Sequence, residues 1–178
     1  MSSLLLSSLF AKHGSDKTTD HSYGEFYDRL QSHRAGMRSI LELGVYRGAS
    51  LLALAEAFPL ANVHGIDVDL SRMPEIGEPR ITTHKIDVLD QHAMRQLALQ
   101  HGPFDLVIDD GAHTLLTMLA GYFLLSRYMA TGGIYVIEDV PSDDHLQYLM
   151  AIPGATKHDY RRPGRPTDDL LVSIEARS

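Results

Sequence analysis

Residues 39–50 read SILELGVYRGAS, and this stretch decides the fold. The apolar residues before Gly44 form the short run typical of a strand that is buried on both faces of a parallel sheet. Gly44 and Gly48 favour a turn, and a helical pattern follows from Ala49 to Phe58. We therefore predict a strand, a glycine turn and a helix, with the first backbone amides of the helix facing a bound small molecule.

The spacing within the turn argues against a dinucleotide. A dinucleotide fingerprint reads G-x-G-x-x-G/A, but Tyr46 stands where its second glycine should be when the pattern is counted from Gly44. The turn is instead preceded by Glu42, and a second acid, Asp67, lies near the end of the next apolar stretch, NVHGIDVD. Glu42 can meet a cationic amine and Asp67 a ribose. S-adenosylmethionine carries both groups and has no phosphate.

Two later strands each end in a pair of acids. The strands are predicted from FDLVIDD, ending at Asp109 and Asp110, and from GIYVIEDV, which contains Glu138 and Asp139. The carboxyl ends of parallel strands meet in one crevice, so the four carboxylates should converge beside the glycine turn. They repel one another unless a cation is bound, and oxygen ligands in a chain without cysteine suit magnesium. His113 follows closely enough to face the same crevice.

These motifs resemble a known family. ELGVYRG followed by GIDVD is similar to the first two motifs of class I S-adenosylmethionine-dependent methyltransferases, although that family usually has a glycine where this chain has Tyr46. The resemblance implies a Rossmann-like, three-layer α/β fold whose mostly parallel seven-stranded sheet ends in an antiparallel hairpin. VIDDGAH with GGIYVIED, and GSDK with HSY near the N-terminus, resemble the metal-dependent sugar O-methyltransferases that act on macrolide antibiotics.

By position, this resemblance implies a role for each matching residue. It places magnesium on Asp110, Glu138 and Asp139, and the catalytic base at His113. It also implies that Thr18 and His21 line the cofactor or the substrate entrance. Together with the reasoning from the turn, the predicted cofactor-binding residues are Lys17, Tyr23, Glu42, Gly44, Tyr46, Gly48, Ser50, Asp67, Asp87, Val88 and Asp109.

Several of these residues also have a purely structural interpretation. Asp87 or Asp90 could cap the helix predicted from Gln91 to Gln100, and acids at strand ends often bind backbone amides. The segment that contains Lys17 could be a capped surface helix. A lone histidine in a turn, such as His113, is commonly a hydrogen-bonding residue.

Composition limits the possible functions. The 178 residues, 44% of them hydrophobic, predict one domain over residues 1–178, with a helical cap at 1–36 and a catalytic core at 37–178. The net charge of −7 argues against nucleic acid as a partner. The absence of cysteine excludes disulfides and thiol catalysis and fits a cytoplasmic protein.

Local sequence patterns also predict the N-terminal helix and the elements of the C-terminal third of the chain. Leu4, Leu5, Leu9 and Phe10 share helical spacing in a run that is too short to span a membrane, so we expect a short helix that packs on the domain or on a second subunit in a homo-oligomer. After a helix over Leu115 to Met129, Gly132 and Gly133 should turn the chain into the next strand. The C-terminal segment predicts a hairpin around the loop RPGRPTD.

The sequence thus predicts an O-methyltransferase that uses S-adenosylmethionine and magnesium. Its acceptor would be a hydroxyl of a small molecule, such as a sugar or vicinal diol of a natural product. Two alternatives stay open, namely a catechol-type O-methyltransferase and a non-catalytic S-adenosylmethionine-binding module that works through a partner protein.

Overall fold

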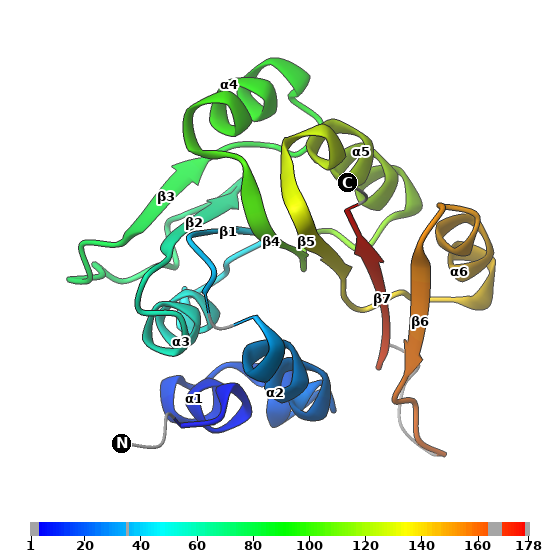
Figure 1. The fold of residues 1–178 in the computed structure, drawn as a ribbon, viewed down its shortest axis with the longest axis horizontal. Helices are drawn as coiled ribbons and strands as arrows, with labels where there is room; N and C mark the ends of the chain where they lie inside the picture. The colour runs from blue at the N-terminus through cyan, green and yellow to red at the C-terminus, as the bar shows by residue number, and fades with distance from the viewer. Residues whose placement is uncertain (1–3, 35, 164–168, 177–178) are drawn as a thin grey trace.

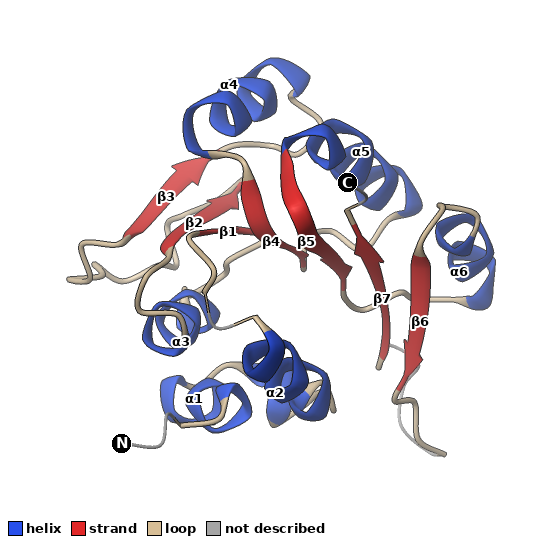
Figure 2. Ribbon diagram, viewed as in Figure 1, coloured by secondary structure: helices blue, strands red, loops and turns tan. Residues whose placement is uncertain are grey.

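A computed structural model describes residues 4–34, 36–163 and 169–176, and within these ranges seven strands form one sheet with helices on both faces (Figure 1, Figure 2). The strands are β1 (Ser39–Leu43), β2 (Asn62–Asp67), β3 (Ile81–Lys85), β4 (Phe104–Asp109), β5 (Met129–Ile137), β6 (Ala155–Asp159) and β7 (Leu170–Glu175). The helices are α1 (Leu6–His13), α2 (Gly24–His33), α3 (Ala49–Ala57), α4 (Gln91–His101), α5 (Leu115–Leu125) and α6 (Asp143–Met150), with 3-10 turns η1 (Asp16–Thr18) and η2 (Ser126–Tyr128).

The strand order is β3-β2-β1-β4-β5-β7-β6. The first five strands of this order run parallel, whereas β7 is antiparallel to both β5 and β6. The predicted class I methyltransferase fold with an antiparallel finish is confirmed. The order reverses direction at β1, which lies between β2 and β4, and ligands bind at such a reversal beyond the carboxyl ends of the strands.

Apolar layers cover both faces of the central strands, and successive residues of a strand point into opposite layers. Ile40 packs in the apolar layer that includes residues of α1, α2 and α3, whereas Leu41 packs in the layer that includes residues of α4, α5 and α6. Figure 2 shows these two groups of helices on opposite sides of the strands. This double burial accounts for the nearly continuous apolar run in β1.

The start of β5 corrects one prediction. The long helix ends at Leu125, and Gly132 and Gly133 lie inside β5 instead of forming the turn before it. Met129 pairs with Phe104 and Ile134 pairs with Leu106, so β5 carries extra residues between two paired positions. Gly132 has a φ of 71°, which suits a glycine in such an irregularity.

The N-terminal helix is present, but two of its predicted members lie outside it. Leu9 and Phe10 are buried, whereas Leu4 and Leu5 precede α1 and are exposed. Lys12 binds Glu56 of α3 at 2.7 Å, which ties the first helix to the third. No helix in the described part of the chain is both long and apolar enough to cross a membrane.

The predicted C-terminal hairpin is formed by β6 and β7. Most of the arginine-rich loop between them, including Arg165, lies outside the described residues. Arg161 is engaged by Asp159 at 2.7 Å and by Asp143 at 3.0 Å. These pairs hold Arg161 at the edge of the sheet.

Candidate active site

A cavity of about 930 Å³ opens beyond the carboxyl ends of β1, β2 and β4. This volume is within the usual range for small-molecule sites. The predicted site residues that line it are Lys17, Gly44, Tyr46, Ser50, Asp67, Asp87, Val88, Asp109, Asp110, His113 and Asp139. Six other predicted residues are not among those that line it, namely Thr18, His21, Tyr23, Glu42, Gly48 and Glu138.

The glycine at position 44 is required by the protein's own backbone. Gly44 has a φ of 83°, and a Cβ there would lie 2.1 Å from the carbonyl oxygen of Asp110. The chain after β4 therefore passes directly against the turn after β1. Gly48 also has positive φ, but a Cβ there would meet Met73 and Ile76 at 2.8 and 2.9 Å.

Tyr46 stands at the second glycine position of the dinucleotide fingerprint counted from Gly44, and it adopts a glycine-like conformation with a φ of 45°. Its exposed ring lies against the guanidinium groups of Arg47 and Arg72, at 5.2 and 5.6 Å from the ring centroid. Asp67 holds this turn, since its Oδ2 accepts hydrogen bonds from the amides of Val45 and Tyr46 at 3.0 and 3.1 Å. Asp67 thus both lines the cavity and shapes it.

Glu42 is fully buried behind the turn. One of its carboxylate oxygens, Oε2, accepts a hydrogen bond from the Ser50 hydroxyl, while Oε1 has no hydrogen-bond partner. Burial raises the pKa of Glu42 to about 7, although the nearby ammonium of Lys17 opposes this. That oxygen lies 3.4 Å from the ammonium of Lys17, and a buried acid with a raised pKa of this kind is typical of a functional site.

Lys17, from η1, places a cation among the acids. Its Nζ lies 2.6 Å from Asp110 and 3.4 Å from Glu42, and it also donates a hydrogen bond to Glu138. Burial lowers the pKa of Lys17, but the three carboxylates outweigh that effect and raise the pKa well above its ordinary value. Part of the positive charge that we expected from a metal ion is therefore supplied by the chain itself.

Glu138 belongs to this buried network. Its Oε2 contacts Lys17, and its Oε1 accepts a hydrogen bond from the hydroxyl of Tyr27 on α2, which was not among the predicted site residues. Burial raises the pKa of Glu138, against the opposing effect of Lys17. The polar tip of a buried tyrosine needs a hydrogen-bond partner, and that requirement is the signal that could have indicated Tyr27.

A second group of polar side chains faces the cavity. One carboxylate oxygen each of Asp110 and Asp139 and one ring nitrogen of His113, atoms that could bind a metal ion, all lie within 4.8 Å of one another. The Nε2 atom of His113 is 3.9 Å from Asp110 and 4.0 Å from Asp139. This group shares Asp110 and Asp139 with the predicted metal site but has His113 in place of Glu138.

The backbone is unusual at the same place. Within the described ranges, the non-glycine residues with positive φ are Tyr46, His113 and Asp139, at 45°, 52° and 51°. All of them line the cavity. Residues in this sparsely populated conformation cluster at functional sites, where surrounding structure holds them.

Two residues of the N-terminal segment contact the carboxylate of Asp139. Tyr23 donates a hydrogen bond to its Oδ1, and His21 Nδ1 lies 3.3 Å from the same oxygen. The His21 ring also lies 3.1 Å from Asp169, a buried acid that was not among the predicted site residues. Thr18 binds the carbonyl of Ser7 and is not among the residues that line the cavity.

The two aspartates near α4 have different positions. Asp90 caps the helix, because its carboxylate accepts hydrogen bonds from the amides of His92 and Ala93. Asp87 lies at the cavity together with Val88. Of the two candidates for a cap, Asp90 is the one that binds the first amides of α4.

Asp109 also has a structural partner. It is buried, and its carboxylate accepts a hydrogen bond from Tyr135 at 3.2 Å. Burial raises the pKa of Asp109 to about 7. This acid lines the cavity, but it is also part of the core beneath it.

The sheet order and this cavity define an α/β protein with a small-molecule site at the carboxyl edge of its parallel strands. The chain belongs to the methyltransferase domain family, which matches residues 41–140.

Similar proteins include sugar O-methyltransferases. The chain is 34% identical to 8-demethyl-8-alpha-L-rhamnosyl tetracenomycin-C 2'-O-methyltransferase of Streptomyces olivaceus, over 95% of this chain and 51% of that protein. It is 33% identical to mycinamicin VI 2''-O-methyltransferase of Micromonospora griseorubida, over 67% of this chain and 32% of that protein. The chain thus spans about half the length of the first relative and about a third of the second.

A solved structure has the same fold. MycE methyltransferase from the mycinamycin biosynthetic pathway, in complex with Mg and SAH, superposes with a TM-score of 0.79 at 25% identity. The match covers 99% of this chain and 56% of that one.

Proposed function

We propose that this protein is an S-adenosylmethionine-dependent, magnesium-dependent O-methyltransferase whose acceptor is a hydroxyl on a sugar or another vicinal diol of a natural product. The observation that carries the proposal is the group of Asp110, His113 and Asp139 beside the glycine turn, in one cavity. The relatives that methylate sugar hydroxyls support the choice of acceptor.

The cofactor would occupy the part of the cavity around the glycine turn. Asp67, at the end of β2, and Asp87, beyond β3, carry carboxylates suited to hydroxyl or amine groups. Val88 offers apolar contact beside them. The N-terminal segment would cover this space, since Lys17 lines the cavity although it lies before the first strand.

The donor set fits a hard divalent ion, which prefers carboxylate oxygens. Asp110 and Asp139 would hold it, with Glu138 as the third ligand that the resemblance implies. Both oxygens of Glu138 contact Lys17 or Tyr27, so metal binding there would compete with these two groups. When bound, the ion lowers the pKa of an acceptor hydroxyl, and S-adenosylmethionine supplies the methyl group.

His113 would remove the proton from the acceptor. Its side chain is 35% exposed in the cavity wall, with Nε2 facing Asp110 and Asp139, whereas Nδ1 is buried without a hydrogen-bond partner. A neutral imidazole can accept a proton from a hydroxyl within hydrogen-bond reach. Asp139, held by Tyr23 and His21, would keep the site aligned.

Isothermal titration tests the proposal. Chelator-treated protein is titrated with S-adenosylhomocysteine and then with magnesium, using the wild type, Asp139→Asn and the control Asp144→Asn, which changes an exposed acid on α6. We expect S-adenosylhomocysteine to bind, and the magnesium signal to be lost only in Asp139→Asn. Failure of S-adenosylhomocysteine to bind under either condition would overturn the proposal. Turnover with a panel of sugars and diols then separates an enzyme from a non-catalytic binding module.

A further inference from the structure

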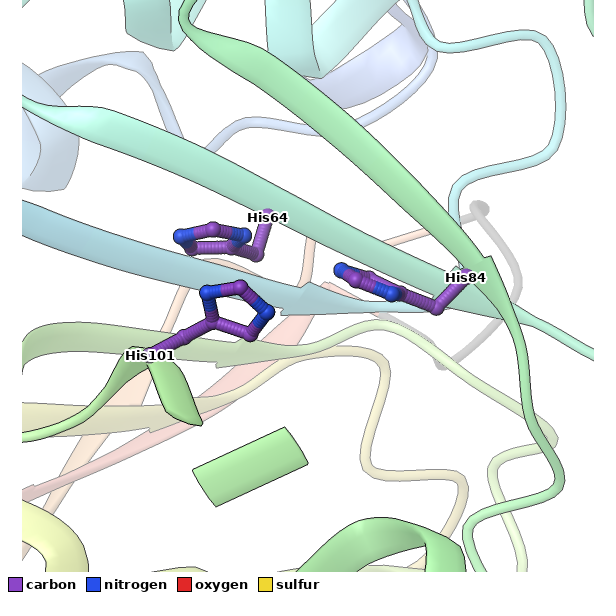
Figure 3. Close-up of side chains that lie close together, drawn as sticks. All are labelled: His64, His84 and His101. Carbon is purple, nitrogen blue, oxygen red and sulfur yellow. The ribbon is translucent and has the colours of Figure 1, made fainter. Parts of the chain in front are cut away.

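Three histidines meet on the sheet face opposite α1 to α3, away from the cavity described above. His64 is in the middle of β2, His84 is in β3, and His101 is the last residue of α4 (Figure 3). None of the three lines the cavity. The end of one helix and two neighbouring strands therefore bring their imidazoles together.

The rings are close enough to share an ion. Their centroids are 4.1 Å apart for His64 and His101, 5.2 Å for His84 and His101, and 5.9 Å for His64 and His84. One nitrogen from each ring lies within 4.8 Å of the other two. Small side-chain rotations would bring these nitrogens to the 2.0–2.1 Å bond length that zinc takes with histidine.

Each of the three histidines also has an unsatisfied nitrogen. His64 Nδ1, His84 Nε2 and His101 Nε2 are buried and have no hydrogen-bond partner. The His64 residue as a whole is only 6% exposed. Unsatisfied buried polar atoms are rare and costly in folded proteins, and a binding site for an ion is a standard reason for them. A shared ion would give three such atoms a partner at once.

The protonation state suits a ligand role. Burial, together with the smaller effects of the neighbouring imidazoles of His101 and His84, lowers the pKa of His64 to about 4. Burial also lowers the pKa of His84. Metal binding requires neutral imidazoles, and burial favours the neutral form of His64 and His84.

We propose that His64, His84 and His101 form a second metal site, which holds a borderline-soft divalent ion, zinc foremost, and joins the end of α4 to β2 and β3. Three imidazoles without carboxylates favour zinc over magnesium. His84 and His101 are partly exposed, which gives the ion a path from solvent and leaves a fourth position for water. The site does not depend on the proposed methyltransferase activity.

Zinc competition measurements test this site. Tag-free, chelator-stripped protein is titrated with zinc against a chromophoric chelator, in an excess of magnesium that occupies the carboxylate group at the cavity. We expect the wild type to bind one equivalent, and His84→Gln and His101→Gln to bind it at least tenfold more weakly. His92→Gln removes an exposed histidine from the same helix α4 and should bind zinc like the wild type.

Two further measurements separate zinc binding at the three histidines from zinc binding at the cavity and from loss of folding in the variants. Asp139→Asn should still bind one equivalent of zinc. This result distinguishes the histidine site from the group of Asp110, His113 and Asp139 at the cavity. Zinc should raise the melting temperature of the wild type and of His92→Gln but not that of His84→Gln, with circular dichroism confirming that every variant is folded. The proposal is overturned if the wild type binds no zinc, if His84→Gln and His101→Gln bind as tightly as the wild type, or if Asp139→Asn loses the equivalent.

Discussion

The ammonium nitrogen of Lys17 lies 2.6 Å from a carboxylate oxygen of Asp110, although 93 positions separate the two residues. The contact joins η1, near the N-terminus, to the end of β4 in the centre of the sheet. Because Glu138 and Glu42 lie against the same ammonium, the N-terminal segment neutralises part of the acidic crevice. Folding of that segment and assembly of the site are therefore coupled.

Replacement of Lys17 should destabilise the protein strongly. Lys17→Met leaves buried Glu138 without its cation, which costs about 3–5 kcal/mol in free energy of unfolding. The matched control is Lys12→Met, which breaks an exposed pair with Glu56 and should cost at most about 1 kcal/mol. Urea denaturation of both variants measures the difference. Equal losses would show that the buried pairing contributes little.

The turn after β1 should not tolerate a side chain at position 44. Gly44→Ala places a methyl group against the Asp110 carbonyl in a left-handed conformation, and the expected loss is about 2–5 kcal/mol. Gly14→Ala is the control, since Gly14 has a similar φ of 78° with no atom within 4 Å of its Cβ position. The control should lose about 1–2 kcal/mol. Thermal melting compares them, and similar melting temperatures would contradict the close approach.

His113→Ala should impair turnover more than cofactor binding. Loss of a general base typically lowers kcat by about 10²–10⁴-fold. Affinity for S-adenosylhomocysteine should stay close to that of the wild type, as titration calorimetry can show. His92→Ala, which removes an exposed histidine, serves as the control. Full turnover by His113→Ala would exclude His113 as the base.

Asp109 should make stability depend on pH. Its pKa is about 7 in the folded protein, above the ordinary value of 3.8, because the carboxyl is buried. The folded state therefore holds this proton more tightly than the unfolded state, and the contribution to stability falls as pH rises from about 4 to about 7. Asp109→Asn lacks this titration, so its stability relative to the wild type should increase over the same range. Denaturation at pH 5 and pH 8 measures the change, and a constant difference would contradict it.

Much of the fold could be predicted from local patterns. The apolar run before Gly44, the glycines after it and the helical spacing from Ala49 match β1, the turn and α3. The beginning of β5 could not be predicted in this way. Glycines usually mark turns, yet Gly132 and Gly133 accommodate an irregular pairing with β4 that depends on the neighbouring strand.

The candidate site could be predicted only in part, for a similar reason. Acids at the ends of parallel strands meet at one edge of the sheet, so the sequence predicted that four carboxylates would face the same space. Three of them, Asp109, Asp110 and Asp139, line the cavity, whereas Glu138 does not. It did not predict that Tyr27 would bind Glu138. A tyrosine at helical spacing looks like a core residue until its partner is known.

The sequence by itself determined the order of the elements and the edge of the sheet that carries the acids, because burial periodicity and glycine conformations act over a few neighbouring residues. Only the tertiary structure decided which charged and polar side chains contact one another in the site. Glu138 contacts Lys17 and Tyr27, whereas adjacent Asp139, with a left-handed backbone, faces His113. The meeting of His64, His84 and His101 likewise depends on how α4 packs on β2 and β3. Such contacts join residues that are distant along the chain, and only the packing of the elements brings them together.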